Sequence, residues 1–249
     1  MEAYPTTFVP DQVEPRALAP PRLETQPAEG QRWSADAPVL GRGVVAVVEA
    51  LLKSPASILR EVQEGRGASA RLSLVVAASA IVVGLVTASF SGGLQFVLVP
   101  MKMVGGVFFC ALICLPSLHI FSCLSGARQS LKETWGALLM GVALMGLLLL
   151  GFAPIAWIFS QATSSVAFVG GLHLLFLTLS CVLGLRLVDR TLAAMNRAPL
   201  RGLRMWSTLF VVVLFQMSTT LRPFVGAADG VRLEERLFFL THWVKALAS

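Results

Sequence analysis

From residue 72 onwards, long apolar stretches alternate with short polar connections. Each stretch is 16 to 22 residues long, close to the roughly 20 residues that an α-helix needs to cross a bilayer. No Asp or Glu interrupts any of them, and Pro154 lies just beyond the third. The pattern predicts an all-α integral membrane protein whose membrane domain, 66–224, contains five transmembrane helices at 72–90, 103–124, 135–152, 166–185 and 206–221.

Residues 43–65 carry two shorter apolar patterns ahead of the first span. Apolar residues recur at helical spacing up to Leu52, and the pattern resumes with Ile58 after Pro55. Ser54 is suited to cap the second helix, with Pro55 in its first turn. The first piece is too short and the second too charged to cross a bilayer. We therefore predict two amphipathic helices at the membrane interface.

A short apolar segment, 94–99, precedes Pro100 and Lys102. Lys102 is the only charged residue between Arg71 and Arg128. A charge at the bilayer centre costs about 2.5 to 3.5 kcal/mol, so we expect Lys102 to extend its ammonium to the outer interface at the start of the second span. The segment before it is too short to span, and we predict a re-entrant or interfacial segment packed against the bundle.

The two ends of the chain differ from its middle. Residues 1–42 contain seven of the thirteen prolines and few large apolar side chains, which predicts a disordered cytoplasmic tail. Residues 225–249 carry an amphipathic pattern with Trp243 on the apolar side. Because Trp prefers the headgroup boundary, this pattern predicts a helix on the outer membrane surface that contacts lipid or a partner.

Composition agrees with a membrane protein, since 55% of the residues are hydrophobic and 14% are charged, against about 25% charged in an ordinary soluble domain. The net charge is +6. No aromatic and basic recognition motif accompanies this charge, so we expect no nucleic-acid partner. The basic residues are more typical of topology control and of contact with anionic lipid headgroups.

Lys and Arg gather in alternate connections between the spans. Ten of them lie at 60–71 just before the first span, between the second and third spans, or between the fourth and fifth, whereas the other connections between spans hold Lys102 alone. Cytoplasmic loops carry the excess of basic residues, so we predict a bacterial inner-membrane protein with a cytoplasmic N-terminus and an external C-terminus. The last of these connections supplies the predicted lipid or partner contacts, Arg186, Arg190, Arg197, Arg201 and Arg204.

The first predicted span contains small residues at every fourth position, Ala80, Gly84 and Ala88. Such a stripe lets two helices approach closely. It predicts a packing face, which meets either another span or another subunit, and we expect a homo-oligomer or hetero-oligomer with other membrane proteins.

Residues able to carry chemistry are few. All four cysteines, Cys110, Cys114, Cys123 and Cys181, fall in hydrophobic runs, where a thiol packs as a small apolar group. A metal or redox site at Cys110 and Cys114 can be drawn, but it lacks further ligands. We expect His119 and His173 to be neutral and bonded to backbone carbonyls. The sequence predicts no catalytic residue, no metal and no cofactor, and hence no enzyme.

Three sequence segments carry a resemblance to a known family: LLKSPASILREVQEG before the first span, SGGLQFVLVPMK at the second and QMSTTLRPF after the fifth. With the five-span layout, residues 44–225 resemble the prokaryotic branch of the Yip1-like membrane protein family. The resemblance implies five spans with the N-terminus inside. Eukaryotic members are linked to vesicle traffic and small GTPases, but their acidic, tyrosine-containing motif has no counterpart here, where the single tyrosine is Tyr4.

Two functional hypotheses follow. The first is a non-enzymatic membrane protein that organises or anchors partner proteins through the stripe, the basic connection and the terminal helix. The alternative is an accessory subunit of a transporter or channel, with an anion-accepting outer vestibule near Lys102 that is lined by Lys102, Gln216 and Arg222. Pro100 is a further candidate for a functional or interface residue.

Overall fold

The computed structural model describes residues 41, 43–89, 95–163, 166–196 and 202–220. Within these ranges the chain is helical, with no strand, which confirms the all-α prediction. The predicted N-terminal tail, apart from Gly41, and the predicted C-terminal helix lie outside the described residues. The helices are α2 (Val44–Lys53), α3 (Pro55–Gln63), α4 (Ala68–Ala88), α5 (Gln95–Leu124), α6 (Leu131–Ala162), α7 (Val166–Asn196) and α8 (Leu203–Thr220).

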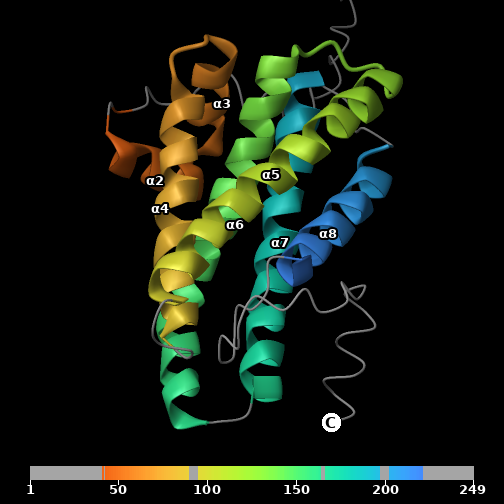
Figure 1. Ribbon diagram of the computed structural model, residues 1–249. Coiled ribbons are helices and arrows are strands. Elements are labelled where there is room, and N and C mark those ends of the chain that lie inside the picture. The colour runs from red at the N-terminus through yellow and green to blue at the C-terminus, as the bar shows by residue number, and fades with distance from the viewer. Residues whose placement is uncertain (1–40, 42, 90–94, 164–165, 197–201, 221–249) are drawn as a thin grey trace, which may run out of the picture.

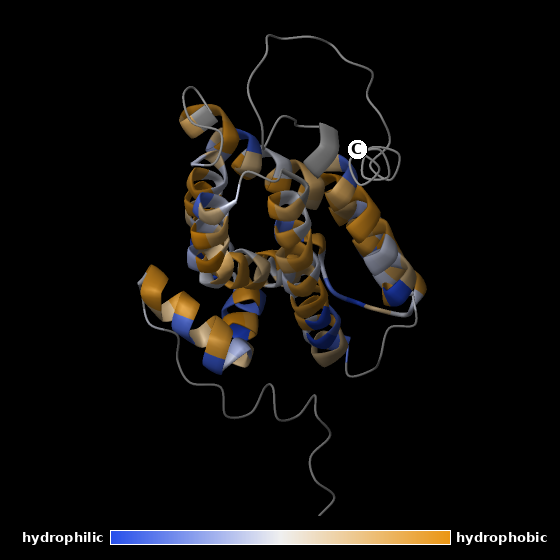
Figure 2. Cartoon of the chain, turned by 90° about the horizontal axis from the view of Figure 1, so that it is seen from below, coloured by the Kyte–Doolittle hydropathy of each residue, from blue (hydrophilic) through white to orange (hydrophobic). Residues whose placement is uncertain are grey.

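The long helices α6 and α7 run side by side and form the centre of the bundle (Figure 1). Helix α4 packs along α6, and α5 crosses α4 and α6 obliquely. Helix α8 packs against α5, and the short helices α2 and α3 lie against α4 and α6. Most of the helix surface is coloured as hydrophobic in Figure 2, as expected for helices that face lipid.

Among the described residues, four helices are long and apolar enough to cross a membrane, as expected for a membrane protein. They are Ala68–Ala88, Phe96–Leu124, Leu131–Ala162 and Phe168–Asn196. The apolar part of α8 within the described residues, Leu203–Met217, is shorter. The fifth predicted span is therefore present as a helix but stays a prediction as a membrane span.

The segment before Pro100 is not re-entrant. Helix α5 begins at Gln95, not at 103, and continues through Pro100 and Pro116 to Leu124. Val99 and Pro100 are buried, so the expected packing against the bundle holds at these two residues. A helix satisfies its backbone internally, which lipid requires, and this explains why the segment joins α5 instead of forming a separate element.

Helices α6 and α7 extend beyond the predicted spans. Helix α6 starts with a capping box, in which the Ser130 backbone N–H donates to Glu133 Oε2 at 2.7 Å and the Glu133 N–H donates to Ser130 Oγ at 3.3 Å. It continues through Pro154 to Ala162, so the prediction that Pro154 lies beyond the helix is wrong. Proline is tolerated inside membrane helices because neighbouring groups satisfy the freed carbonyl.

Close contacts between backbones hold the central helices together. A Cβ at Gly184 of α7 would lie 2.6 Å from the carbonyl oxygen of Gly141 in α6, so only glycine fits at this crossing. Helix α8 is fixed to α5 by Trp206, whose side chain is fully buried. Its indole Nε1 donates to Cys114 O at 3.1 Å and to Ser117 Oγ at 3.2 Å.

The two predicted amphipathic helices are confirmed as α2 and α3. Val47 of α2 and Ile58 of α3 are fully buried against the bundle, whereas Leu52 at the end of α2 is exposed. Ser54 is the N-cap of α3 and Pro55 its first residue, as predicted. The Ser54 hydroxyl makes no capping bond, and the Ser57 hydroxyl donates to the Ser54 carbonyl at 2.8 Å instead.

Candidate functional site

Hydrogen bonds join three chain segments at one end of the bundle. The Arg128 N–H, in the connection between α5 and α6, donates to Asn196 Oδ1 at the end of α7 (3.1 Å). The Asn196 amide also donates to Gln129 Oε1 at 2.7 Å. The Gly202 N–H, just before α8, donates to Ser125 Oγ at 3.4 Å. The α5–α6 connection, the end of α7 and the start of α8 therefore form one bonded unit.

The start of α4 is tied to its neighbours by a partly buried ion pair. Arg71 of α4 pairs with Glu61 of α3, and the two side chains are 19% and 12% exposed. The second guanidinium nitrogen of Arg71 donates to the Gly41 carbonyl at 2.8 Å. Val62 of α3 lies directly against Gly136 of α6, so this cluster packs against the same end of α6 as the unit described above.

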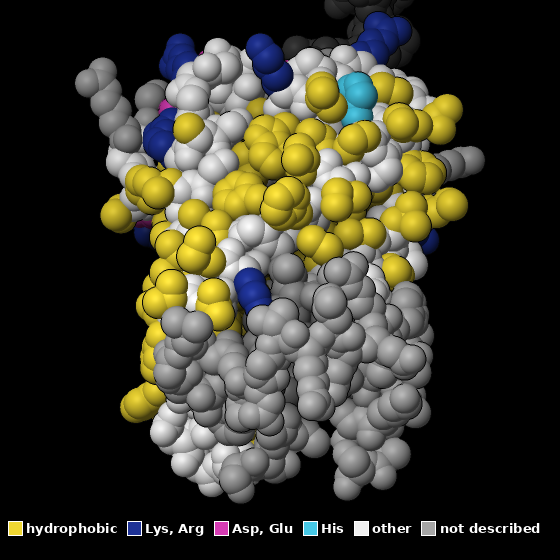
Figure 3. Space-filling view, viewed as in Figure 1, with side chains coloured by type: hydrophobic (Ala, Val, Ile, Leu, Met, Phe, Trp, Pro, Cys, Tyr) yellow, Lys and Arg dark blue, Asp and Glu magenta, His cyan; other side chains and the backbone are white. Residues whose placement is uncertain are grey.

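Among the described residues, five basic side chains are exposed at this end, which we call the basic end: Arg128, Lys132, Arg186, Arg190 and Arg204. The ion pairs found among the described residues, Lys53–Glu49, Arg60–Glu64, Arg66–Glu64 and Arg71–Glu61, include none of the five. Figure 3 shows Lys and Arg gathered along the upper rim of the molecule, above a broad hydrophobic surface. The geometry suits contact with anionic headgroups or acidic protein segments, since each Lys or Arg near an anionic membrane contributes about 1 kcal/mol.

The sequence predicts a loop for Arg186 and Arg190. This prediction is wrong, because α7 continues to Asn196 and carries both residues. At i, i+4 spacing they share one exposed face of the helix. Arg204 also lies on a helix, in the first turn of α8. Arg197, Arg201, Arg222 and Trp243 lie outside the described residues.

The small-residue stripe on α4 faces the interior of the chain. Ala80, Gly84 and Ala88 are all buried. A Cβ at Gly84 would lie 2.7 Å from Pro100 Cα in α5. The structure thus answers the question that the sequence left open for Gly84: its contact is another helix of the same chain.

Lys102 and Gln216 lie on paired helices. Lys102 is in the second turn of α5 and Gln216 is near the end of α8, and both side chains are partly buried. The contacts of Trp206 with Cys114 and of Gly202 with Ser125 show that α8 runs antiparallel to α5. The antiparallel order places Gln216 towards the end of α5 that carries Lys102.

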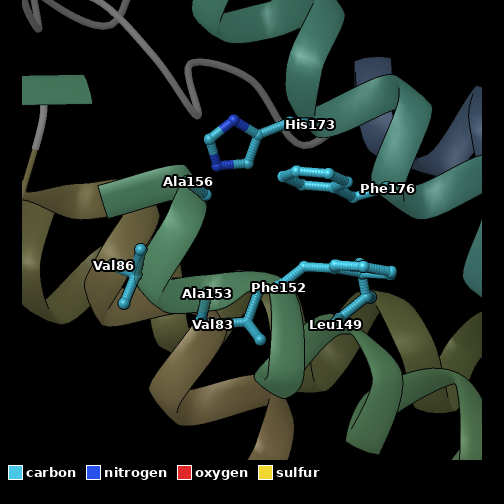
Figure 4. Close-up of a pocket in the computed structure, with 8 residues that line it drawn as sticks. All are labelled: Val83, Val86, Leu149, Phe152, Ala153, Ala156, His173 and Phe176. Atoms are coloured by element: carbon cyan, nitrogen blue, oxygen red, sulfur yellow. The ribbon is translucent and has the colours of Figure 1, made fainter. Parts of the chain in front are cut away.

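A small apolar cavity of about 20 Å³ lies between α4, α6 and α7 (Figure 4). His173 lines it, beside the stacked rings of Phe152 and Phe176, whose centroids are 4.6 Å apart. The His173 Nδ1–H donates to the Val169 carbonyl at 2.8 Å, which confirms the predicted bond to a backbone carbonyl. The other ring nitrogen, Nε2, lies 3.5 Å from Thr87 Oγ1. This volume holds about one water molecule.

Three of the cysteines, Cys110, Cys114 and Cys181, are buried and pack as apolar groups, as predicted. Cys123 differs, because it is exposed in the last turn of α5. Its Sγ lies 3.7 Å from Nε2 of His119, whose Nδ1 lies 3.1 Å from Thr134 Oγ1. The bond of His119 is thus to a side chain and not to the expected carbonyl. The i, i+4 spacing of the pair was visible in the sequence, but its contact with α6 was not.

No group of three or more His, Cys, Asp or Glu side chains with metal-binding geometry occurs in the part of the chain that the structure describes. Comparison of the chain with protein-family models, curated proteins and solved structures finds no significant match.

Proposed function

We propose that the chain is a non-enzymatic multi-pass membrane protein that organises or anchors partner proteins at a bacterial inner membrane, with the basic end as its main contact surface. Its oligomeric contacts involve other membrane proteins, and its lipid contacts involve anionic headgroups. In this proposal α8 is the fifth span, and the layout is that of a prokaryotic Yip1-like protein.

The observation that carries the proposal is the construction of the basic end. Its basic side chains come from separate segments that hydrogen bonds join into one unit, through Arg128 with Asn196 and Gly202 with Ser125. Glu61 and Glu64 are paired with other basic residues, and Glu133 accepts hydrogen bonds from Ser130. Asp189 is exposed beside Arg190, so the five basic side chains outnumber the carboxylates among the described residues of this end. The positive charges therefore lie on a surface whose segments are fixed by hydrogen bonds, which is what contact with an anionic partner requires.

The orientation follows from the same charges. An excess of Lys and Arg at one end places that end in the cytoplasm, so the basic end faces the cytoplasm and Lys102 lies nearer the outer side. Cytoplasmic proteins and the anionic inner leaflet are then the available partners.

Affinity purification of the full-length chain in mild detergent tests the proposal, with copurifying proteins and lipids identified by mass spectrometry. The test variant carries Arg186→Gln and Arg190→Gln, and the control carries Lys53→Gln, which alters an exposed ion pair on α2, outside the basic end. At about 1 kcal/mol for each charge, the test variant is expected to retain roughly thirtyfold less anionic lipid or acidic partner.

Two results would contradict the proposal. If the wild-type chain brings down no membrane or cytoplasmic protein at stoichiometric amounts, it does not anchor partners. If the test variant and the control retain partners and anionic lipid equally, the basic end is not the contact surface. Deleting residues 230–249 separately tests the C-terminal segment, which we expect to release a partner without preventing membrane insertion.

The second candidate function is an accessory subunit with an anion-accepting outer vestibule near Lys102, lined by Lys102, Gln216 and Arg222. The pairing of α5 with α8, which carry Lys102 and Gln216, favours it. Anion uptake into proteoliposomes containing the wild-type chain is expected to fall in the Lys102→Ala variant. Uptake that is the same in both would rule out this site.

A further inference from the structure

Three side chains near the end of α5 are arranged as a nucleophile, a base and a group that orients the base. The Cys123 thiol lies 3.7 Å from His119 Nε2, and His119 Nδ1 lies 3.1 Å from Thr134 Oγ1. Cys123 is exposed, whereas Thr134 is fully buried. A nucleophile within hydrogen-bonding reach of a base, which a third group holds in place, is the recurring arrangement of activated thiols.

The hydrogen bonds determine which nitrogen of the neutral His119 ring carries the proton and which one can act as a base towards the thiol. The Thr134 hydroxyl has one hydrogen, which it donates to the Ser130 carbonyl at 3.0 Å. Thr134 Oγ1 must therefore accept a hydrogen bond from His119, and the proton of the neutral ring lies on Nδ1. The lone pair of Nε2 then points at Cys123, ready to accept the thiol proton.

The surroundings indicate the kind of substrate. Ile120 and Leu124, which flank Cys123 on α5, are 57% and 79% exposed and present an apolar surface suited to a hydrocarbon chain. Arg128 and Lys132 follow within ten residues, and both are exposed. The thiol therefore lies where an apolar face meets positive charge, as a donor with a fatty chain and a phosphorylated carrier requires.

We propose that Cys123 accepts a long-chain fatty acyl group from an acyl thioester, with His119 as the base and Thr134 as a positioning residue. His119 Nε2 takes the proton from the thiol as Sγ attacks the thioester carbonyl carbon. The bond between that carbon and the carrier sulfur breaks, and the carrier thiolate takes the proton from Nε2. The products are an S-acyl chain on Cys123 and the free carrier thiol, with no change of oxidation state.

The test uses the purified full-length chain in proteoliposomes and alkyne-tagged palmitoyl-coenzyme A below its micellar concentration. Hydroxylamine-sensitive label is quantified over time, and the labelled peptide is identified by mass spectrometry. The variants are Cys123→Ser, His119→Gln and Cys110→Ala. A matched control combines Cys123→Ser with Leu124→Cys, which moves an exposed thiol one position along, where Ile120 replaces histidine at i−4.

We expect one label on each chain at Cys123, none in Cys123→Ser, and an unchanged rate in Cys110→Ala. General-base catalysis typically contributes 10²- to 10⁴-fold, so the rate should fall about a hundredfold in His119→Gln and to a similar level in the Leu124→Cys control. Thr134→Val should slow labelling at least threefold, and Thr134→Ser should restore it. An end-point titration of accessible thiols checks that each variant still exposes its cysteine.

Other outcomes would overturn the proposal. Equal rates for the wild type, His119→Gln and the Leu124→Cys control would show an ordinary exposed thiol with no base. Absence of label at Cys123, while its thiol titrates fully, would show that the site does not accept acyl thioesters.

Discussion

Gly84 of α4 lies so close to Pro100 of α5 that a Cβ at position 84 would be 2.7 Å from Pro100 Cα. Nearly every real Cβ contact is longer, so α4 and α5 can cross in this way only with glycine at position 84. Pro100, in the second turn of α5, is packed into the space that the missing side chain leaves. The crossing thus depends on both residues.

Replacing Gly84 with alanine is expected to destabilise the bundle by about 1 to 3 kcal/mol, because the added methyl group must push the helices apart. The matched control is Gly105→Ala, since a Cβ there meets no heavy atom within 4 Å. The control should be neutral or more stable by up to about 1 kcal/mol, as alanine is the better helix former. Thermal unfolding in detergent compares the two, and equal shifts would contradict the close crossing.

Replacing Trp206 with phenylalanine removes the indole N–H that bonds to Cys114 O and Ser117 Oγ. We expect a loss of about 1 to 3 kcal/mol in the free energy of unfolding, because Trp206 and Cys114 are buried. Trp157→Phe is the control, since Trp157 is 49% exposed, and it should change stability by less than about 0.5 kcal/mol. Denaturant titration followed by circular dichroism measures both, and equal effects would argue against α8 being fixed by this bond.

The Glu61→Gln substitution leaves Arg71 without its carboxylate. A fully buried pair broken on one side costs about 3 to 5 kcal/mol. Here the two side chains are 19% and 12% exposed, so we expect a smaller loss of about 1 to 3 kcal/mol in the free energy of unfolding. Unfolding of the Glu61→Gln protein at neutral pH measures this cost, and a change no larger than that of an exposed pair would contradict the structural role of Arg71.

The exposed Glu49–Lys53 pair serves as the comparison for the Glu61–Arg71 pair. Its contribution to stability can also be measured as a function of pH. The hydrogen bond from Lys53 lowers the pKa of the Glu49 carboxyl below 4.5. Any stabilisation from the pair is present above pH 4.5 and is lost as the pH falls through the lowered pKa. Because both groups face solvent, we expect Lys53→Gln to leave the melting temperature unchanged on both sides of this pH range.

Orientation can be tested by labelling single cysteines in a chain whose four native cysteines are replaced by alanine. Lys132→Cys lies at the basic end and Gln161→Cys at the opposite end of α6, and both positions are exposed. In spheroplasts, a membrane-impermeant maleimide should label Gln161→Cys and leave Lys132→Cys unlabelled until the membrane is permeabilised. The reverse pattern would place the basic end outside the cytoplasm.

Much of the architecture could be predicted from local patterns. Amphipathic spacing identified α2 and α3, and the run of apolar residues located the core of each long helix. The ends of the helices were predicted less well, because a drop in hydropathy after Leu185 marks where apolar surface ends and not where the helix ends. The prediction that the third span ends before Pro154 failed for a related reason, since a proline that ends a helix in water can stay inside a helix in lipid.

The candidate sites depended on contacts that no local pattern contains. The spacing of Ala80, Gly84 and Ala88 indicated a packing face, but only the fold shows that Pro100 packs against Gly84. The sequence places His119 and Cys123 one turn apart, whereas the orientation of the ring depends on Thr134, which comes from the next helix. Tertiary packing therefore decides whether such a pair is merely adjacent or arranged for chemistry.

The continuation of α7 beyond Leu185 affects how the basic end would bind the anionic partners proposed for it. The 11 further residues, up to Asn196, lengthen the helix by about 16 Å. Residues in a flexible loop lose about 1 to 2 kcal/mol of backbone entropy each when a ligand orders them. Arg186 and Arg190 have already lost that entropy during folding, and their separation is fixed at one helical turn. This part of α7 should therefore select anionic groups by their spacing, and binding should show a small entropic penalty.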